Sequence, residues 1–320
     1  MEPDTHQKDP SDEKGEDVKG AVVLSGGAMV GMAWQTGVVA GLAQSGVNLH
    51  DADMILGTAA GASLAWRLAA GQSAADLAAA IDHEAYLPPA SNPTSRTTPP
   101  SGIPDLLWRQ FKAEMAGEDT IALRRQIGAL AMPGTAEDEA SFLEKTDQFI
   151  PIGRDQPWPA AFSCSAIDAE TGELVVWQAA STIALSQGVA SSCSVPISNP
   201  PVTIGGRRFI SGAMRSVSNV DLATGYDNVL VIAMRSPPGD ARMAERMQQS
   251  LDFEVSRLRK DGTTVDVIQP DEASMAAIGH ELADVLDLRR RPAACKAGID
   301  QGKSLAGSIK PGWGQSDFLR

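Results

Sequence analysis

The residues with the clearest chemical potential lie in two glycine-rich turns, at residues 25–31 (SGGAMVG) and 57–61 (GTAAG). The second turn has the form of a GxSxG nucleophile elbow, in which glycines permit a sharp bend and a serine is presented at the start of a helix. Position 59 is alanine, and Ala59 has no atom that can attack a carbonyl carbon. We therefore expect an elbow that keeps its bend and lacks its nucleophile.

The first turn would direct backbone N–H groups from a helix start toward a developing negative charge, as an oxyanion hole does. Gly26, Gly27 and Ala28 in this turn, and Ala60 beside the elbow, are the candidate oxyanion-binding or ligand-binding positions. The competing interpretation is a dinucleotide-binding turn, but the GxGxxG spacing is not matched and residues 44–47 supply no acidic partner for a ribose. We favour the oxyanion interpretation.

Each turn needs a strand before it and a helix after it. Residues 21–24 and 54–56 are short apolar runs that predict buried strands, each followed by its glycine turn and a helical pattern. No charged residue occurs from 21 to 50, so a membrane span is an alternative, but six glycines in this stretch favour strand, turn and helix.

Strands and helices continue to alternate along the chain, as in proteins built on a parallel sheet. Further strands are predicted at 162–167, 174–177, 202–204, 229–234 and 264–268, and helical patterns cover 243–258 and 272–288. Residues 1–19 predict a disordered acidic leader, residues 20–305 one domain with a lid-like insertion at 88–150, and residues 306–320 a flexible tail.

Composition narrows the possible partners. The chain has 320 residues, 43% of them hydrophobic, and a net charge of −13, which disfavours nucleic acid because binding to phosphates depends on Lys and Arg. Three widely spaced cysteines and four histidines without metal-binding spacing predict no disulfide framework, no metal and no cofactor. The acidic start is unlike a secretory signal, so we expect a cytoplasmic protein without a transmembrane segment, associated with membranes only peripherally.

A third segment, residues 207–223 (RRFISGAMRSVSNVDLA), completes a recognisable set. Together with the two turns, it resembles the patatin-like phospholipase family, in its bacterial form, over about residues 20–305. The resemblance implies a three-layer α/β/α sandwich with a mainly parallel central sheet. It also implies a catalytic pair that cleaves lipid acyl esters, with the serine at Ala59 and the aspartate, in a DGG or DGA motif, at Ser211.

Both positions of that pair are substituted. Ser25 also stands where the family usually has glycine, and Val30 where many members have Arg or Lys. The first hypothesis is a non-hydrolytic pseudoenzyme that binds a lipid or acyl ligand, or pairs with an active patatin-like relative or with itself. The alternative is a lipid acyl hydrolase whose sequence is shown in inactivated form, or a pocket adapted to different chemistry. Double loss favours natural decay, because a serine hydrolase that lacks one member of the pair gains little from the other.

A displaced nucleophile is the remaining possibility. The candidates are Cys193, Ser194, Ser211 and Ser63, none with a visible base, and Ser63 is expected to be a hydroxyl on the helix surface. Asp221 is expected to cap a short helix, and His83 and His280 to be surface or packing residues. Trp34, Trp66 and Trp108 could line an apolar cleft or pack in the core, and Trp66 could line or plug the old pocket.

Overall fold

The computed structural model of the chain describes residues 18–82, 102–132, 138–149, 156–196, 199–236, 241–309 and 313. Within these residues one eight-stranded sheet has the order β5-β6-β3-β2-β1-β7-β8, and β4 pairs with β3. The strands are β1 (Gly20–Leu24), β2 (Met54–Gly57), β3 (Phe162–Asp168), β4 (Leu174–Gln178), β5 (Val202–Ile204), β6 (Arg207–Ser211), β7 (Asn228–Ile232) and β8 (Thr264–Ile268). All seven strands expected from the sequence are present, and β6 is the strand that the sequence did not predict.

The central strands are parallel: β1 pairs with β2 and β7, β7 with β8, and β2 with β3. Strand β3 is antiparallel to both β4 and β6, and β5 is antiparallel to β6. Because β4 pairs with β3 along both stretches used by β2 and β6, those two strands lie end to end on the opposite edge of β3. This arrangement places the end of β2 beside the end of β6.

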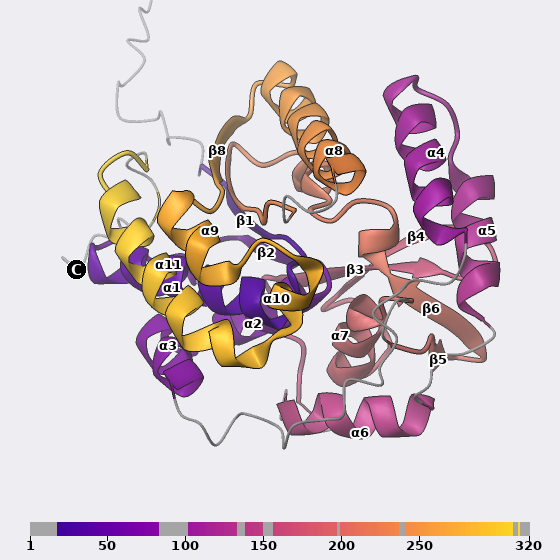
Figure 1. Cartoon of the computed structure of the whole chain (residues 1–320), viewed down its shortest axis with the longest axis horizontal. Helices are drawn as coiled ribbons and strands as arrows, with labels where there is room; N and C mark the ends of the chain where they lie inside the picture. Colours follow the sequence, from indigo (N-terminus) through magenta and orange to yellow (C-terminus); the bar gives the residue numbers. More distant parts are fainter. Residues whose placement is uncertain are drawn as a thin grey trace, which may run out of the picture.

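Helices cover both faces of the sheet (Figure 1). Along β1, Ala21 and Val23 pack toward one face, against α8, and Val22 and Leu24 pack toward the other, with α1, α2 and the C-terminal helices. This alternation is the two-residue period of a strand that is buried on both sides. The predicted three-layer α/β/α architecture with a mainly parallel sheet is confirmed.

The helices are α1 (Ala28–Gln44), α2 (Ala60–Ala69), α3 (Ala74–Asp82), α4 (Ile103–Met115), α5 (Ile121–Ala131), α6 (Glu139–Phe149), α7 (Leu185–Cys193), α8 (Ala241–Lys260), α9 (Glu272–Ile278), α10 (Leu282–Leu286) and α11 (Arg291–Leu305). Short 3₁₀ turns are η3 (Gly212–Met214), η4 (Val220–Ala223) and η5 (Leu288–Arg290). The expected insertion at 88–150 contributes α4, α5 and α6, and residues 88–101 lie outside the described part.

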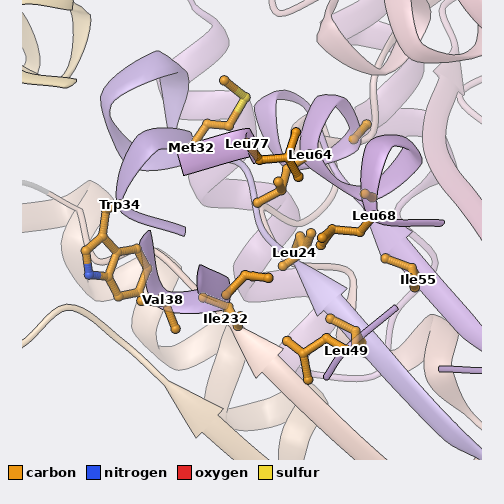
Figure 2. Close-up of a cluster of buried hydrophobic side chains, with 14 of the residues drawn as sticks. Leu24, Met32, Trp34, Val38, Leu49, Ile55, Leu64, Leu68, Leu77 and Ile232 are labelled. Carbon is orange, nitrogen blue, oxygen red and sulfur yellow. The ribbon is translucent and has the colours of Figure 1, made fainter. Parts of the chain in front are cut away.

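Figure 2 shows the core on the α1 and α2 side of the sheet, where Leu24, Ile55 and Ile232 of three neighbouring strands meet side chains from the helices. Trp34 of α1 is fully buried there, and its indole N–H donates to Gln301 Oε1 of α11 at 3.0 Å. Trp34 is therefore a core residue, and the suggestion that it lines a ligand cleft is wrong.

Helices α1 and α11 approach closely through glycines. A Cβ atom placed on Gly37 would lie 2.0 Å from the carbonyl oxygen of Cys295, and one placed on Gly298 would lie 2.2 Å from that of Trp34. Only residues without a side chain permit such an approach of two backbones. Helix α11 thereby fixes α1, and with it the glycine turn from which α1 begins.

The helical pattern predicted for 272–288 is interrupted. Gly279 has φ 111°, a conformation that a helix cannot continue, and α9 ends at Ile278. The carboxylate of Asp284 accepts hydrogen bonds from the backbone N–H groups of His280 and Glu281 and so starts α10. The prediction of one continuous helix is therefore wrong at this glycine.

The two ends of the chain lie largely outside the described residues, including 1–17 of the expected leader. Lys19 is described, and its N–H donates to Asp227 Oδ2 at 2.8 Å. In the expected tail, Ile309 and Trp313 are buried. A Cβ atom added to Gly20 would lie 3.5 Å from the Trp313 ring, which is an ordinary van der Waals distance. No helix among the described residues is both long enough and apolar enough to cross a membrane.

Candidate functional site

The two glycine turns lie side by side at the carboxyl ends of β1 and β2. The parallel register pairs Leu24 with Gly57, so each turn begins at the same level of the sheet. A Cβ atom added to Gly26 would lie 3.4 Å from the Cβ of Ala59, which is van der Waals contact. The two turns, residues 25–31 and 57–61, therefore form one site, which we call the cradle.

The elbow has the strained backbone of its motif. Ala59 has φ 51° and ψ −124°, a combination that residues with a side chain rarely adopt and that costs on the order of 1–3 kcal/mol. The flanking glycines are required by space, since a Cβ on Gly57 would lie 2.3 Å from Ala62 Cα and one on Gly61 would lie 2.3 Å from Leu24 O. The bend therefore survives although position 59 carries only a methyl group.

This strain predicts an unusual response to substitution. An Ala→Gly change inside a helix normally costs about 1 kcal/mol, but at Ala59 the loss is offset because glycine adopts positive φ without penalty. We expect Ala59→Gly to be at least about 1 kcal/mol more stable than Ala62→Gly, a buried helical position of the same α2. Urea unfolding of both variants measures the difference. Equal losses at the two positions would contradict the strained elbow.

Backbone N–H groups at the cradle differ in their availability. The Gly26 N–H donates to Val217 O at 2.8 Å, so it is already engaged. Among the described residues, the N–H groups of Gly27, Ala28 and Ala60 have no hydrogen-bond acceptor. They lie at or just before the starts of α1 and α2, where the partial positive charge of a helix attracts an anion or a carbonyl oxygen. Two helix starts thus converge at one place.

Ser25, which departs from the family pattern, holds the first turn in place. Its hydroxyl accepts from Met234 N at 2.8 Å and donates to Gly26 O at 3.1 Å. Gln35 Nε2 donates to the Ser25 carbonyl at 2.9 Å and to Ile232 O at 3.0 Å, which ties α1 to β1 and β7. The substitution at Ser25 therefore has a structural role in the turn.

Ser211 lies close to the elbow along β3. Strand β2 ends at Gly57, paired with Cys164, and β6 ends at Ser211, paired with Ala166 on the same edge. Two residues of a strand span roughly 7 Å, so the ends of β2 and β6 face each other across about that distance. Ser211 is fully buried, and its hydroxyl accepts from Ala213 N at 3.2 Å.

A polar network joins the elbow to the segment after Ser211. Thr58 Oγ1 lies 3.0 Å from Ser165 Oγ, and Asn219 Nδ2 lies 3.2 Å from Thr58 Oγ1 and 3.4 Å from Ser165 Oγ. A Cβ on Gly212 would lie 2.2 Å from Ser165 Oγ, so the glycine lets the segment approach β3. The structure therefore brings together the three sequence segments that were singled out.

Comparison with known proteins bears on these three segments together. A family model described as patatin-like phospholipase matches residues 22–224, which include both turns and the Ser211 segment. The chain belongs to the patatin-like phospholipase family. A search of curated proteins finds no match.

The chain is also similar to solved structures of two bacterial proteins. VipD from Legionella pneumophila is 16% identical over 92% of this chain and 67% of its own, with a TM-score of 0.48. ExoU, in its heterodimeric complex with SpcU from the type III secretion system of Pseudomonas aeruginosa, is 15% identical over 90% of this chain, with a TM-score of 0.36. The present chain spans about half of that ExoU chain, 52% of its length.

The C-terminal end of α7 lies against the elbow of this patatin-like chain. Ser192 Oγ accepts from Ala59 N at 3.0 Å, Cys193 Sγ donates to Ala59 O at 3.2 Å, and Ser194 O accepts from Ser211 N at 2.8 Å. Sequence reasoning missed Ser192, because only the pairing of the strands places α7 beside position 59. The backbone at both family dyad positions is fixed by this one helix end.

The displaced-nucleophile candidates are poorly suited to attack. Burial raises the pKa of the Cys193 thiol to about 11, and the thiol rather than the reactive thiolate is present near neutral pH. Ser63 is buried and lies 3.6 Å from Cys193 Sγ, so the expectation of a surface hydroxyl is wrong. Ser194 is buried and donates to Pro200 O. Cys164 is likewise held as a thiol, since burial raises its pKa.

Asp221 does not cap the helix that it was expected to cap. It lies inside η4, whose N-cap residue is Asn219, and its carboxylate forms a two-pronged contact with the Arg215 guanidinium. The charge partner six residues earlier determines this orientation. His280 is exposed on the α9–α10 connection, and His83 lies outside the described residues. Among the described residues, no cluster of His, Cys, Asp or Glu could hold a metal ion.

Two further tryptophans have different surroundings. Trp66 is buried in the core cluster of α1 and α2, and the cradle residues Ala28 and Ala60 pack against the same cluster. Trp108 of α4 is half-buried and lies between two cations, with Lys112 Nζ 4.7 Å and Arg242 Cζ 5.1 Å from its ring centre.

Helices α4 and α5 pack their apolar sides into the cluster that contains Ala59. The α4 residues of this cluster are Ile103, Leu106 and Leu107, and Ile127 belongs to α5. Figure 1 shows this pair of helices beside β3, β4 and β6, on the side of the molecule away from α1 and α11. Ala59 is 6% exposed. We call α4 and α5, residues 103–131, the cover.

A cluster of charged groups lies where the cover meets α8 and the Ser211 segment. Arg215 contacts Asp221 and lies 3.4 Å from Glu114 of α4, and Arg246 of α8 donates to the Arg215 carbonyl at 3.2 Å. Burial raises the pKa of Glu114, raises that of Glu254 on α8 to about 7, and lowers that of Arg246 to about 10. Burial and neighbouring charges together therefore shift the pKa values of the groups in this cluster.

Proposed function

We propose that this patatin-like protein does not hydrolyse esters by the Ser–Asp mechanism and instead binds the acyl group of a lipid in the retained cradle. The observation that carries the proposal is the strained elbow backbone at Ala59 beside the Gly27 and Ala28 donors, with neither member of the reactive pair present. A hydroxyl-free elbow cannot form an acyl-enzyme. The cradle geometry remains suitable for a carbonyl or carboxylate oxygen.

The polar end of the ligand would be held by hydrogen bonds from the N–H groups of Gly27, Ala28 and Ala60. A carboxylate or carbonyl oxygen at two helix starts gains from both the hydrogen bonds and the helix dipoles. The hydrocarbon end would replace contacts now made by the apolar underside of the cover, such as Leu106 and Leu107. The cover would therefore act as the lid that the 88–150 insertion suggests, and move aside to admit the chain.

The substitutions around the dyad support loss of hydrolysis as a settled state of this sequence. The Ser25 hydroxyl takes part in three hydrogen bonds of its turn, and the Ser211 hydroxyl accepts from the Ala213 N–H in η3. A single alanine introduced into a working hydrolase would not be accompanied by such a replacement at the acid position. The alternative is an ester hydrolase in inactivated form. It expects serine as the natural residue at position 59, whereas our proposal expects alanine.

A variant that fills the cradle tests binding directly. Gly26→Val places methyl groups in the contact between Gly26 and Ala59, whereas Gly307→Val adds the same side chain where nothing lies within 4 Å. We expect a fluorescent C16 fatty acid to bind the parent chain and Gly307→Val alike, and Gly26→Val at least tenfold more weakly. Fluorescence titration measures the affinities. Equal affinity for Gly26→Val and the parent would place the acyl site elsewhere.

A further inference from the structure

Arg215 lies at a junction of three parts of the molecule. Its guanidinium donates to Asn219 Oδ1 at 2.9 Å and grips the Asp221 carboxylate with Nη1 at 2.9 Å and Nη2 at 2.5 Å. The same Nη2 lies 3.4 Å from Glu114 Oε1, on the cover helix α4. The Arg215 side chain is only 11% exposed, so solvent screens these contacts weakly.

The backbone of Arg215 is held as firmly as its side chain. Its carbonyl oxygen accepts from Gln110 Nε2 of α4 at 3.0 Å and from Arg246 Nη2 of α8 at 3.2 Å. Gln110 is fully buried, and its Nε2 also lies 3.2 Å from Met214 O. The cover therefore touches this residue twice, once through a charge and once through an amide.

The other end of the chain of contacts is the elbow. Asn219 has a left-handed backbone, φ 51° and ψ 42°, which turns its side chain so that Oδ1 meets Arg215 and Nδ2 meets Thr58. Nδ2 also lies 2.5 Å from Ser216 O, so the amide is fixed on both sides. Thr58 directly precedes Ala59. The path from the cover to the elbow is thus Glu114, Arg215, Asn219 and Thr58.

We propose that Arg215 is a positioning residue that couples the cover to the elbow, so that release of α4 from Arg215 loosens the backbone at positions 58 and 59. An arginine suits this role because its planar fork bonds Asn219, Asp221 and Glu114 simultaneously, which a lysine ammonium cannot do in the same geometry. The elbow of the proposed acyl site would then reach its working shape only while the cover is seated. The biological role of this coupling rests on the proposed function, but the coupling itself can be measured without any ligand.

Glu114 provides the acidic contact between the cover and Arg215. The groups that face Arg215 are Glu114 from α4, Arg124 from α5, Asp221 from η4, and Arg246 and Glu254 from α8. Only Glu114 and Arg124 belong to the cover. Neutralising Glu114 removes the carboxylate that links the cover to Arg215 and leaves the Arg215–Asp221 pair in place.

Hydrogen exchange of the full chain tests the coupling. Glu114→Gln should raise amide exchange at least fivefold in peptides from the cover and, in parallel, in peptides containing residues 57–62. The matched control is Asp105→Asn, which breaks a different ion pair of α4, the Asp105–Arg242 contact with α8 at 3.2 Å, where both side chains are more than half exposed. We expect the control to change neither region by more than twofold.

Two outcomes would overturn the proposal: faster exchange in the cover with an unchanged elbow, or equal effects from Glu114→Gln and Asp105→Asn. If Glu114→Gln unfolds, Arg215→Lys gives a second measurement. Under the proposal it loosens both regions together, because the fork is lost although the charge remains. Loosening of 211–221 alone, with the cover and the elbow unchanged, would show a merely local role.

A double-mutant cycle of Glu114→Gln and Thr58→Val gives an independent test. Hydrogen exchange in the cover should show non-additive effects of the two changes, and additive effects would refute the coupling.

Discussion

The doubly reverted chain, Ala59→Ser with Ser211→Asp, is expected to hydrolyse p-nitrophenyl butyrate roughly a thousandfold faster than the parent chain. Loss of the nucleophile or its base costs a serine hydrolase several powers of ten in rate, so restoring both recovers a large part of that factor. The bend at Ala59 and the donors at Gly27 and Ala28 are already in place. The ends of β2 and β6 face each other along β3 across roughly two residues, within reach of two side chains.

The single reversions are the controls for this result. Members of a catalytic pair act as a unit, so Ala59→Ser alone and Ser211→Asp alone should each stay within about tenfold of the parent rate. Position 211 is fully buried, and a carboxylate introduced there needs its serine partner and the Ala213 N–H. Unfolding curves of all three variants therefore accompany the rates. A folded double reversion with the parent's rate would show that the cradle is not a catalytic geometry.

Replacing Glu254 should change how stability depends on pH. Burial raises the pKa of this carboxyl from 4.5 to about 7 in the folded protein, and its Oε2 accepts from Val220 N at 2.7 Å. Between about pH 4.5 and 7 the folded state therefore holds a proton that the unfolded state has released. The contribution of Glu254 to the free energy of unfolding is fully present below pH 4.5 and is lost as the pH rises through 7.

The size of this loss follows from the shift. A difference of two to three pKa units corresponds to roughly 3 kcal/mol, which Glu254→Gln would remove because glutamine is neutral and still accepts from Val220 N. We expect the variant to match the parent at pH 4.5 and to exceed its unfolding free energy by up to about 3 kcal/mol at pH 8. Urea unfolding at a series of pH values gives the difference profile. A variant less stable than the parent at pH 8 would mean that ionised Glu254 is an indispensable counter-ion for Arg246.

The sequence was most informative about the elements that position the site. Short apolar runs located β1 and β2, because a strand buried on both faces is apolar throughout, and the glycines after them marked the turns. It did not predict β6, whose Arg207 and Arg208 are polar and pair at the sheet's antiparallel end. Nor did it predict the break at Gly279, where one positive φ overrides a helical pattern.

At the site, the motif residues were predictable and their supporting contacts were not. Gly26 and Gly27 stand out as adjacent glycines between an apolar run and a helical pattern, and Ala59 stands out at the serine position of a GxSxG spacing. The contacts of Ser192 with Ala59, of Ser165 with Thr58 and of Arg215 with Glu114 join residues from distant parts of the chain. Such contacts depend on strand order and helix packing, which a pattern of residue types does not encode. The engagement of the Gly26 N–H by Val217 is of the same kind.

Reaction with a long-chain alkyl fluorophosphonate, followed by intact-protein mass spectrometry, is the most direct test of a cradle without a nucleophile. We expect no covalent adduct on the parent chain after prolonged exposure. We expect one adduct per chain on the Ala59→Ser, Ser211→Asp variant, located at position 59. Stoichiometric labelling of the parent at any serine or at Cys193 would contradict the loss of the nucleophile, because a working nucleophile would then be present in the chain as it stands.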